Sequence, residues 1–487
     1  MLVAHLTRDA VRKNVLVVVL VAMFTAWNAA RVSAQTTKPA SAAESNWPAW
    51  RGPLASGFAP SADPPTTWAE DKNVKWKVKI PGRGTASPVV WGDSIFIQTA
   101  IAAAGPESEA ASPVPPTGLR GGPGGPGGPG GRRGGRGGGG GFGAGPKPTS
   151  PYKFVLLCLD RKTGQTRWER VVREEIPHEG HHQDHGFSSY SAVTDGQLVF
   201  AYFGSRGLHC LDMDGNAKWS KDLGKMETRN GFGEGSSPAL HEDTIVINWD
   251  QDGSGEDFIV AFDKNSGEQR WRQPRDESQT WSTPLVVRHD GQAQVITTAT
   301  GKVRSYDLKT GKQLWESPGL TANTIPSPVA NEDMVFATAG FRGSALYAIK
   351  LGGSGDLTGT DSIAWTGKRG TPYVPSPLLY GNRLYMFSGN NGVLSCFDTK
   401  TGKPIVEQQR IDDLEGVYAS PVGAAGRVYL VGRNGATVVI KHLDQTEKIE
   451  PIATNELKDR FDASPAVVGK ELFLRGQENL YCISEEK

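Results

Sequence analysis

One pattern occurs eight times along the chain, and this repeat limits the possible folds more than any single residue does. Each copy opens with a small hydroxyl residue, usually followed by proline, and continues into a short apolar run. The openings are Ser87-Pro88, Ser191-Ala192, Ser237-Pro238, Thr283-Pro284, Ser327-Pro328, Ser376-Pro377, Ser420-Pro421 and Ser464-Pro465. From the second copy onward they are 46, 46, 44, 49, 44 and 44 residues apart. This spacing is typical of the four-stranded blade of a β-propeller.

The interior of each copy supports this interpretation. A tight turn such as Gly92-Asp93 separates two apolar strands, and a third strand ends on Asp. A turn containing Gly follows, and in three copies a Trp lies eight residues after the Asp: Asp160 with Trp168, Asp263 with Trp271, and Asp307 with Trp315. The Asp can accept backbone N–H bonds in the turn, the Gly can adopt positive φ, and the Trp can bury a flat face between blades. We therefore expect an all-β fold of four-stranded antiparallel blades.

The two ends of the chain complete one another. The last copy stops after Ile483, one strand short of a blade. Residues 74–78 supply a strand carrying Trp76 just ahead of the first opening. We expect this N-terminal strand to complete the last blade and close the ring without a covalent bond. The prediction is an eight-bladed β-propeller.

These residues resemble the quinoprotein-type propeller repeat, found in the eight-bladed pyrroloquinoline-quinone dehydrogenases and in the BamB propeller lipoprotein of outer-membrane assembly. The resemblance is notably to exported bacterial propeller proteins that are abundant in planctomycetes. It covers roughly residues 46 to 483 and includes the runs at 46–53, 301–307 and 355–360. The resemblance implies the fold specifically. It implies function only weakly, because one propeller scaffold carries many unrelated activities.

The first residues predict an export signal. Arg12-Lys13 forms a positive region, residues 15–26 form an apolar stretch, and residues 32–34 form a cleavage site of small residues. We expect a signal peptide at 1–34, a linker at 35–45, the propeller at 46–487, and a location in the periplasm or cell envelope. A retained anchor is the alternative, although an apolar run of about 12 residues is short of the ~20 that a span needs. No Cys precedes Cys158, so we expect no acylated cysteine at the mature N-terminus, unlike the BamB-type lipoproteins.

Charge and cysteine placement limit the partners and the covalent links. A net charge of +1 gives no general attraction to nucleic acid or acidic lipid. We expect no nucleic-acid partner, no transmembrane span in the mature protein, and a monomer. The four cysteines occupy one equivalent position of the repeat, where a small buried side chain fits, and equivalent positions of neighbouring blades are too far apart for a disulfide. We expect four free thiols at Cys158, Cys210, Cys396 and Cys482.

An insertion at 102–150 interrupts the first blade between its second and third strands. From 121 to 145 it is almost entirely Gly, with Pro and Arg, so it offers too little apolar surface to offset the entropy of ordering. We expect a disordered surface loop. Its arginines resemble those of RNA-binding Arg-Gly segments, but contact with anionic glycans or wall polymers suits an exported chain better.

Two polar segments are candidate metal sites. Residues 178–185 hold four of the nine histidines, His178, His181, His182 and His185, and imidazole with carboxylate can bind Zn²⁺, Cu²⁺ or Ni²⁺. Residues 178–182 formally fit H-E-x-x-H, but Gly180 and the β context argue against the helix that this motif needs. Weak metal binding, a catalytic metal and a solvated polar loop stay open, and we favour the loop.

The second candidate is the hairpin at 250–257. Asp250 and Asp252 occupy alternate positions there and Gly253 tightens the loop, a pattern that suits Ca²⁺. The EF-hand form fails because the twelfth position is Ala261 and no helices are expected to flank the loop. An acidic hairpin tip is the simpler interpretation. Calcium is therefore a conceivable cofactor, and no cofactor is firmly implied.

Residues just ahead of each opening should lie near the propeller axis, where ligands or partners usually dock. They mix aromatic, amide and charged side chains, which suit a sugar, a peptide or a quinone, and equally an ordinary channel lining. They are Asn230, Phe232, Glu234, Trp281, Asn323, Tyr373, Tyr418, Arg460 and Asp462.

We favour a binding or scaffolding module of the cell envelope, with an envelope protein or glycan as partner, and assign no catalytic residues. The alternative is a quinoprotein oxidoreductase for alcohols or sugars that uses pyrroloquinoline quinone and calcium, with an Asp as general base. The adjacent Cys-Cys pair that the dehydrogenase resemblance implies beneath the quinone does not occur in this sequence. A glycan-processing enzyme with paired carboxylates is a third hypothesis.

Overall fold

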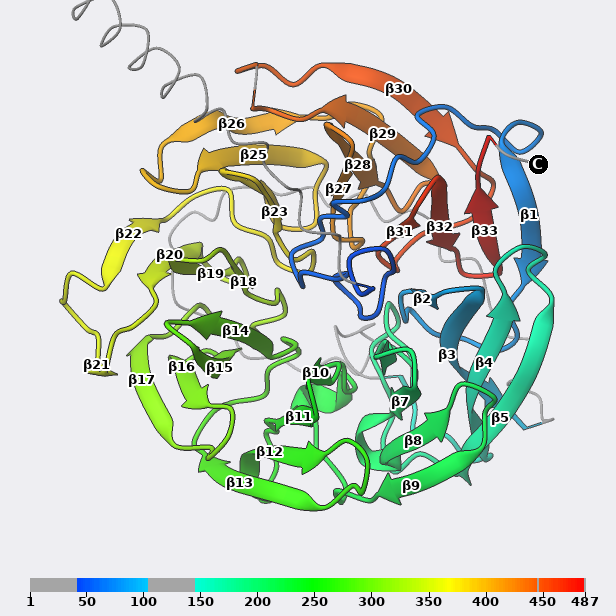
Figure 1. The fold of residues 1–487 in the computed structure, drawn as a ribbon, viewed down its shortest axis with the longest axis horizontal. Coiled ribbons are helices and arrows are strands. Elements are labelled where there is room, and N and C mark those ends of the chain that lie inside the picture. Colours follow the sequence, from blue (N-terminus) through cyan, green and yellow to red (C-terminus); the bar gives the residue numbers. More distant parts are fainter. Residues whose placement is uncertain (1–41, 104–144, 445, 486–487) are drawn as a thin grey trace, which may run out of the picture. The chain divides into compact units, whose positions relative to one another are not determined.

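The computed structural model describes residues 42–103, 145–444 and 446–485 of the chain. They form eight antiparallel sheets, the blades, arranged as a ring around a central axis (Figure 1). The helical elements among these residues are two 3₁₀ turns, η2 (Gly204–Arg206) and η3 (Arg229–Gly231). The expected all-β, eight-bladed propeller is confirmed. The predicted signal peptide and most of the predicted linker lie outside the described residues.

The blades follow one another along the chain, and in each the first strand lies nearest the axis. Blade 1 consists of β2 (Val89–Trp91), β3 (Ser94–Ala102), β4 (Tyr152–Asp160) and β5 (Thr166–Glu175), and blade 2 of β6 (Val193–Thr194), β7 (Leu198–Tyr202), β8 (Leu208–Asp212) and β9 (Ala217–Lys221). Blade 3 consists of β10 (Ala239–His241), β11 (Thr244–Trp249), β12 (Asp257–Asp263) and β13 (Gln269–Arg275), and blade 4 of β14 (Leu285–His289), β15 (Gln292–Thr298), β16 (Lys302–Asp307) and β17 (Gln313–Pro318). A short extra strand, β21 (Gly355–Asp356), pairs in parallel with the outer strand β17.

Blades 5 to 8 continue the ring. Blade 5 consists of β18 (Val329–Ala330), β19 (Met334–Ala339), β20 (Ala345–Lys350) and β22 (Ile363–Gly367), and blade 6 of β23 (Leu378–Tyr380), β24 (Arg383–Phe387), β25 (Val393–Asp398) and β26 (Pro404–Arg410). Blade 7 consists of β27 (Val422–Ala424), β28 (Arg427–Val431), β29 (Ala436–Lys441) and β30 (Pro451–Glu456), and blade 8 of β31 (Ala466–Val468), β32 (Glu471–Arg475), β33 (Asn479–Ile483) and β1 (Val74–Lys79). β1 pairs antiparallel with β33, with Trp76 opposite Cys482. The N-terminal strand therefore completes the last blade, as predicted.

Eight hydrogen bonds join the blades in a closed circle at their first strands. In each bond the backbone N–H of one opening residue donates to the side-chain hydroxyl of the next opening residue, over 2.9 to 3.1 Å. The circle runs from Ser87 to Ser191, Ser237, Thr283, Ser327, Ser376, Ser420, Ser464 and back to Ser87. A buried backbone N–H needs an acceptor. This need explains why every copy of the repeat opens with a hydroxyl residue.

Tryptophans of the outer strands join neighbouring blades nearer the rim. In five blades the indole N–H donates to a backbone carbonyl of the next blade, and the ring lies against a turn glycine of that blade. The pairs are Trp76 with Gly164, Trp168 with Gly215, Trp219 with Gly267, Trp271 with Gly311 and Trp365 with Gly402. A Cβ on any of these glycines would lie 2.6 to 2.8 Å from the ring. The predicted packing of Trp between blades is confirmed at these five contacts. Trp315 differs, because its indole bonds to Gln294 within its own blade.

Residues 46–68 lie across the end of the ring that carries the tight turns, here called the turn face (Figure 1). Their backbone bonds reach blades 1, 2, 6, 7 and 8, through Val90, Thr194, Leu379, Gly423 and Gly469. The Arg51 side chain is 4% exposed and donates to the backbone oxygens of Pro377 and Pro421 at 2.9 and 3.0 Å. Burial lowers the pKa of Arg51 to about 9. This segment therefore ties together blades that β1 alone does not touch.

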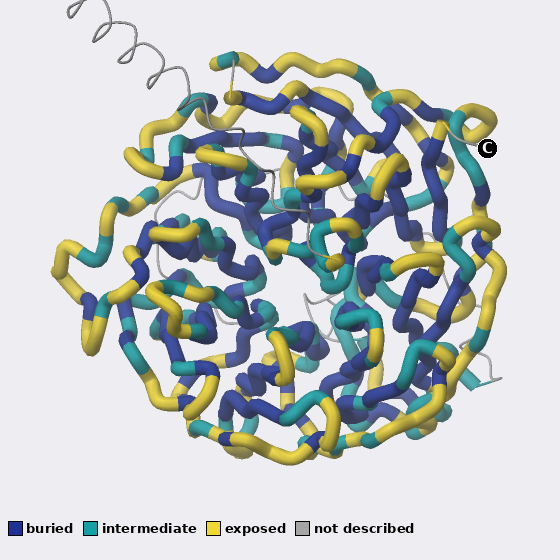
Figure 2. Tube along the Cα trace, viewed as in Figure 1, coloured by how far each residue is buried: buried dark blue, intermediate teal, exposed yellow. Residues whose placement is uncertain are grey.

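Burial follows the blade order, since inner strands are covered and outer strands face solvent (Figure 2). The four cysteines lie in third strands and are buried free thiols, as predicted. The insertion falls between β3 and β4, as expected, but residues 104–144 lie outside the described residues, so its disorder stays a prediction. In the part of the chain that the structure describes, no helix is long and apolar enough to cross a membrane.

The hydroxyl circle predicts a specific effect of Ser420→Ala. This change leaves the buried N–H of Ser376 without its acceptor. We expect the free energy of unfolding to fall by about 1–3 kcal/mol, measured by urea unfolding of the full chain. Ser420→Thr keeps the hydroxyl, as Thr283 does in blade 4, and should stay near wild type. Equal stability of the Ala variant and wild type would contradict this role.

The indole contacts predict that two glycines of blade 4 differ in their response to alanine. Gly311 and Gly291 have φ of +74° and +80°, but only Gly311 lies against a ring, that of Trp271, whereas a Cβ on Gly291 would meet nothing within 4 Å. Both substitutions incur about 1–2 kcal/mol of left-handed strain. Gly311→Ala adds overpacking of roughly 1–3 kcal/mol. Denaturant unfolding of both variants should therefore show a larger loss for Gly311→Ala.

Candidate functional site

The end of the ring opposite the turn face is formed by the connections that lead into each first strand and by the loops between second and third strands. We call it the connection face. All the residues predicted to lie near the axis belong to these connections, because they directly precede the hydroxyl circle. The candidate site is therefore the part of this face nearest the axis.

Residues 178–185, here called the histidine-rich strap, connect β5 to β6 and reach across this face. At one side, His178 Nε2 lies 2.7 Å from the Met226 backbone oxygen, and the His182 N–H donates to the Phe232 oxygen at 3.0 Å. At the other side, Asp184 binds Arg433 of blade 7 and Arg460 ahead of blade 8. The strap thus links segments far apart in sequence and on different sides of the ring.

The four histidines of the strap have partners within the protein. His181 Nδ1 lies 2.8 Å from the His182 backbone oxygen, and His185 Nδ1 lies 2.5 Å from Ser189 Oγ. Nδ1 of His182 accepts the N–H of Asp184. Burial lowers the pKa of His181, and that of His185 to about 3, so both rings are neutral at pH 7. Across 42–103, 145–444 and 446–485, no three His, Cys, Asp or Glu side chains are grouped to hold a metal ion. A metal at these histidines stays a prediction.

The two aspartates of the acidic hairpin are not brought together. Asp250 binds Arg275 through both carboxylate oxygens, at 2.6 and 3.0 Å, and neither side chain is exposed. Asp252 accepts the backbone N–H of Gln279, and its Oδ2 lies 3.9 Å from Arg229 Nε. Asp250 therefore already has a cationic partner, and calcium at this hairpin stays a prediction.

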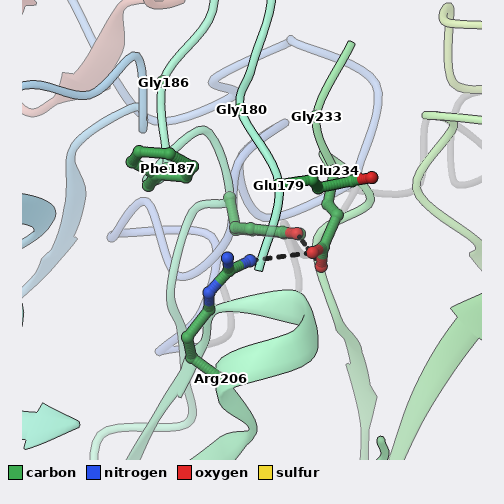
Figure 3. Close-up of a pocket in the computed structure, with 8 residues that line it drawn as sticks. Glu179, Gly180, Gly186, Phe187, Arg206, Gly233 and Glu234 are labelled. Carbon is green, nitrogen blue, oxygen red and sulfur yellow. Dashed lines mark hydrogen bonds and ion pairs between the residues drawn. The ribbon is translucent and has the colours of Figure 1, made fainter. Parts of the chain in front are cut away.

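Glu234 is the centre of a buried polar cluster (Figure 3). Its Oε1 accepts Arg206 Nη1 at 2.8 Å and the Ser205 hydroxyl at 2.7 Å, while Oε2 accepts the Tyr190 hydroxyl at 2.9 Å and the Ser205 N–H at 2.7 Å. A Cβ on Gly204 would lie 1.8 Å from Oε2, so this position requires glycine. Both carboxylate oxygens are thus fully used inside the protein.

A cavity of about 10 Å³ adjoins this cluster, with Glu179, Phe187 and Arg206 among its lining residues (Figure 3). This is room for about one water. Glu179 accepts the Thr228 hydroxyl and N–H, and burial raises the pKa of its carboxyl. The space is too small for an organic substrate.

A second polar cluster lies at the far end of the strap. Asp184 Oδ1 accepts Arg433 Nη2 at 2.8 Å and Arg460 Nη2 at 2.9 Å, and its Oδ2 accepts the Tyr418 hydroxyl at 3.1 Å. Asp462 lies beneath and accepts Arg433 Nε at 2.6 Å. Burial raises the pKa of Asp462 to about 6, against the opposite pull of Arg433. The structure thus brings together the predicted Tyr418, Arg460 and Asp462.

The remaining predicted residues surround the axis without forming one pocket. Half-buried aromatic side chains recur in this region, and we call them the aromatic collar: Phe232, Trp281, Phe341, Tyr373 and Tyr418. Trp281 donates its indole N–H to the Gly233 oxygen at 2.7 Å, and Tyr373 stacks on Phe341 with ring centres 4.9 Å apart. Asn323 is buried and Asn230 is exposed.

Sequence reasoning did not select Asp184, Arg433, Arg206 or Glu179. It considered Glu179 and Asp184 only as part of the histidine-rich segment, and it did not examine the loops between second and third strands that carry Arg206 and Arg433. Those loops reach the same end of the ring, so polar residues in them were a usable signal. Nothing in the repeat indicated that the strap would cross the face, because it departs from the repeat.

Whether the residues near the axis could hold a quinone through a calcium ion depends on the carboxylates there. Glu234, Asp184 and Asp462 are each bound by arginine, which occupies the oxygens a divalent cation would need. The four thiols lie in four different blades. These three carboxylates and the separated thiols, as arranged here, do not fit that group.

A family model described as the outer membrane protein assembly factor BamB matches residues 153–405. The chain belongs to this family. The match confirms the resemblance to the PQQ-like propeller repeat that the sequence indicated. No curated protein matches the sequence.

Solved structures share the fold at low sequence identity. A quinohemoprotein alcohol dehydrogenase from Comamonas testosteroni has a TM-score of 0.55 and 10% identity, with 92% of this chain and 82% of that chain covered. A europium-containing methanol dehydrogenase has a TM-score of 0.52 and 8% identity, with 90% of each chain covered. BamB from Moraxella catarrhalis has a TM-score of 0.49 and 14% identity, covering 67% of this chain and 91% of that one. At these identities the likeness to the two dehydrogenases concerns the fold alone.

The buried cluster predicts a large effect of Glu234→Gln. This change leaves buried Arg206 with only Glu175, whose Oε1 lies 3.6 Å from Arg206 Nε, and we expect the free energy of unfolding to fall by about 3 kcal/mol. Adding Arg206→Met removes the poorly paired charge and should recover much of the loss. Glu242→Gln, at an exposed ion pair with Arg288, is the control and should cost about 1 kcal/mol or less. A small loss for Glu234→Gln in urea unfolding would contradict the assignment.

Proposed function

We propose that this PQQ-like propeller is a binding module of the cell envelope and holds a protein partner on its connection face. The observation that carries the proposal is the difference between the two ends of the ring. Residues 46–68 lie across the turn face, whereas the connection face presents the half-buried aromatic collar. Large, partly exposed aromatic side chains are the residue type enriched at protein interfaces.

The charges of the connection face also favour binding over catalysis. A general base or a nucleophile needs a group within reach of a substrate. Asp184, Glu234 and Asp462 instead have their oxygens occupied by arginine, serine or tyrosine groups. Such pairs hold the loops in a defined arrangement before a partner binds, which suits a docking surface that is already formed.

The place of action rests on two supports. The leader at 1–34 predicts export, and the matching family is described as an outer membrane protein assembly factor. Both point to the periplasm or the inner side of the outer membrane as the place where the partner is met. A protein partner is favoured over a glycan because of that family description.

Site-specific photo-crosslinking in the native host tests this proposal. A photoreactive phenylalanine analogue replaces Tyr373 or Trp281 of the collar in the full chain, and Ile452 on the outer strand β30 serves as the exposed control. We expect both collar positions to crosslink the same envelope protein and Ile452 not to. Crosslinks to that protein only from Ile452, or none from the collar, would overturn the proposal.

A cofactor titration distinguishes the oxidoreductase alternative. Pyrroloquinoline quinone with Ca²⁺ is added to the purified full chain, and thermal stability and quinone absorbance are followed. A tight ligand raises the melting temperature by mass action. We expect no rise, and a saturable rise with bound-quinone absorbance would favour the oxidoreductase instead.

A further inference from the structure

We propose that Tyr418, Arg433 and Arg460 form a carboxylate-binding site on the connection face, which the chain's own Asp184 occupies as an internal stand-in for an acidic side chain of a partner. We call these three residues the carboxylate clamp. The inference rests on the proposed function, since it names the partner chemistry that this face would recognise.

The clamp surrounds one carboxylate with three donors. Arg433 and Arg460 both donate to Asp184 Oδ1, and Tyr418 donates to Oδ2. Hydrogen bonds between a guanidinium and a carboxylate are about twice as strong as neutral ones. The three donors come from three different segments, so the fold itself assembles the site around an anion.

The arginines are held in place independently of Asp184. Asp462, whose side chain is 5% exposed, binds Arg433 Nε at 2.6 Å and lies 3.4 Å from Arg460 Nε. The Arg433 guanidinium lies 3.7 Å from the centre of the Tyr418 ring. Removal of Asp184 therefore leaves two cations with one carboxylate, and this preformed site has a net attraction for an anion.

Access separates this cluster from the two buried ion pairs described above. The side chains of Asp184, Arg433 and Arg460 are 24%, 17% and 30% exposed, whereas Asp250 with Arg275 is fully buried and Glu234 with Arg206 is 4% exposed on each side. Asp184 also lies on a connection, not in a strand. A carboxylate from solvent can therefore replace it when the strap shifts, without breaking a sheet.

The internal ligand sets how strongly an outside carboxylate binds. Asp184 is tethered, so its effective concentration at the clamp is high and a free carboxylate competes poorly. The apparent affinity falls in proportion to the fraction of clamp that is vacant. A partner that also contacts the aromatic collar gains binding free energy there, which offsets this loss of apparent affinity. The ligand class is thus an acidic peptide segment that binds next to an aromatic-binding surface.

Peptide binding to the full chain tests the clamp. The probe is a fluorescein-labelled peptide of alternating Asp and Ser with an amidated C-terminus, followed by fluorescence anisotropy at low salt. We expect Asp184→Ala to bind it at least about tenfold more tightly than wild type. Asp184→Ala combined with Arg433→Gln should lose this gain. Asp412→Ala, which removes an exposed carboxylate of the same face outside the clamp, should match wild type.

Two further peptides identify which carboxylate the clamp takes. A peptide with Asn in place of Asp and an amidated C-terminus should not bind, and binding of this peptide as strongly as the Asp peptide would overturn the proposal. The same Asn peptide with a free C-terminus distinguishes a terminal from a side-chain carboxylate, and binding of only this form would overturn the side-chain assignment.

The result that overturns the clamp itself is equal affinity of wild type and Asp184→Ala for the Asp peptide. Melting curves confirm that each variant is folded, and Asp184→Asn, which keeps the side-chain size, replaces Asp184→Ala if that variant unfolds. Failure of peptide binding with collar crosslinking intact would overturn the clamp alone. Loss of collar crosslinking with peptide binding intact would overturn the proposed function alone.

Discussion

A closed circle of hydrogen bonds from backbone N–H groups to serine and threonine hydroxyls is the interaction on which the rest of this structure depends. Each bond ties the first strand of one blade to that of the next, from Ser87 around to Ser464 and back. Because every first strand starts at this circle, the connections that precede the strands all end at the same face. The circle therefore sets where the candidate site lies.

Closure of the ring is reinforced at three distances from the axis. The hydroxyl circle acts at the centre, the indole contacts of residues such as Trp271 act farther out, and the pairing of β1 with β33 joins the two ends of the chain. Residues 46–68 add a fourth tie across the turn face. A propeller has few contacts between distant blades, so this segment supplies long-range contacts that the repeat alone does not.

The connection face owes its chemistry to residues that leave the repeat. The histidine-rich strap spans the face, and near its end Asp184 is bound by Arg433 of blade 7 and by Arg460 ahead of blade 8. Arginines balance the carboxylates of Asp184, Glu234 and Asp462, and half-buried aromatic side chains lie on the same face. Such a surface suits recognition, and the exposed clamp is the one of these charge clusters that an outside group can enter.

The sequence by itself determined the number of blades, the strand order within each blade, the closing strand and the buried thiols. The same packing contacts are made in each blade, so residues equivalent to Ser420 and Gly311 recur at a regular spacing. Even so, Trp315 shows that a repeated residue can take a different partner when an extra strand lies beside it. The predicted axis residues Tyr418, Arg460 and Asp462 were found because they precede an opening.

Only the tertiary structure decided which of these residues meet. Asp184 and Arg433 lie 249 positions apart, Asp184 in a connection that departs from the repeat and Arg433 in the loop between β28 and β29. A repeat reports contacts that every copy makes, and contacts between unequal loops leave no periodic signal. The metal site suggested by the four clustered histidines stays a prediction, and only the folded chain shows that their rings bond to nearby backbone and hydroxyl groups. Local spacing determined the scaffold, and the long-range path of one strap across the ring determined the site.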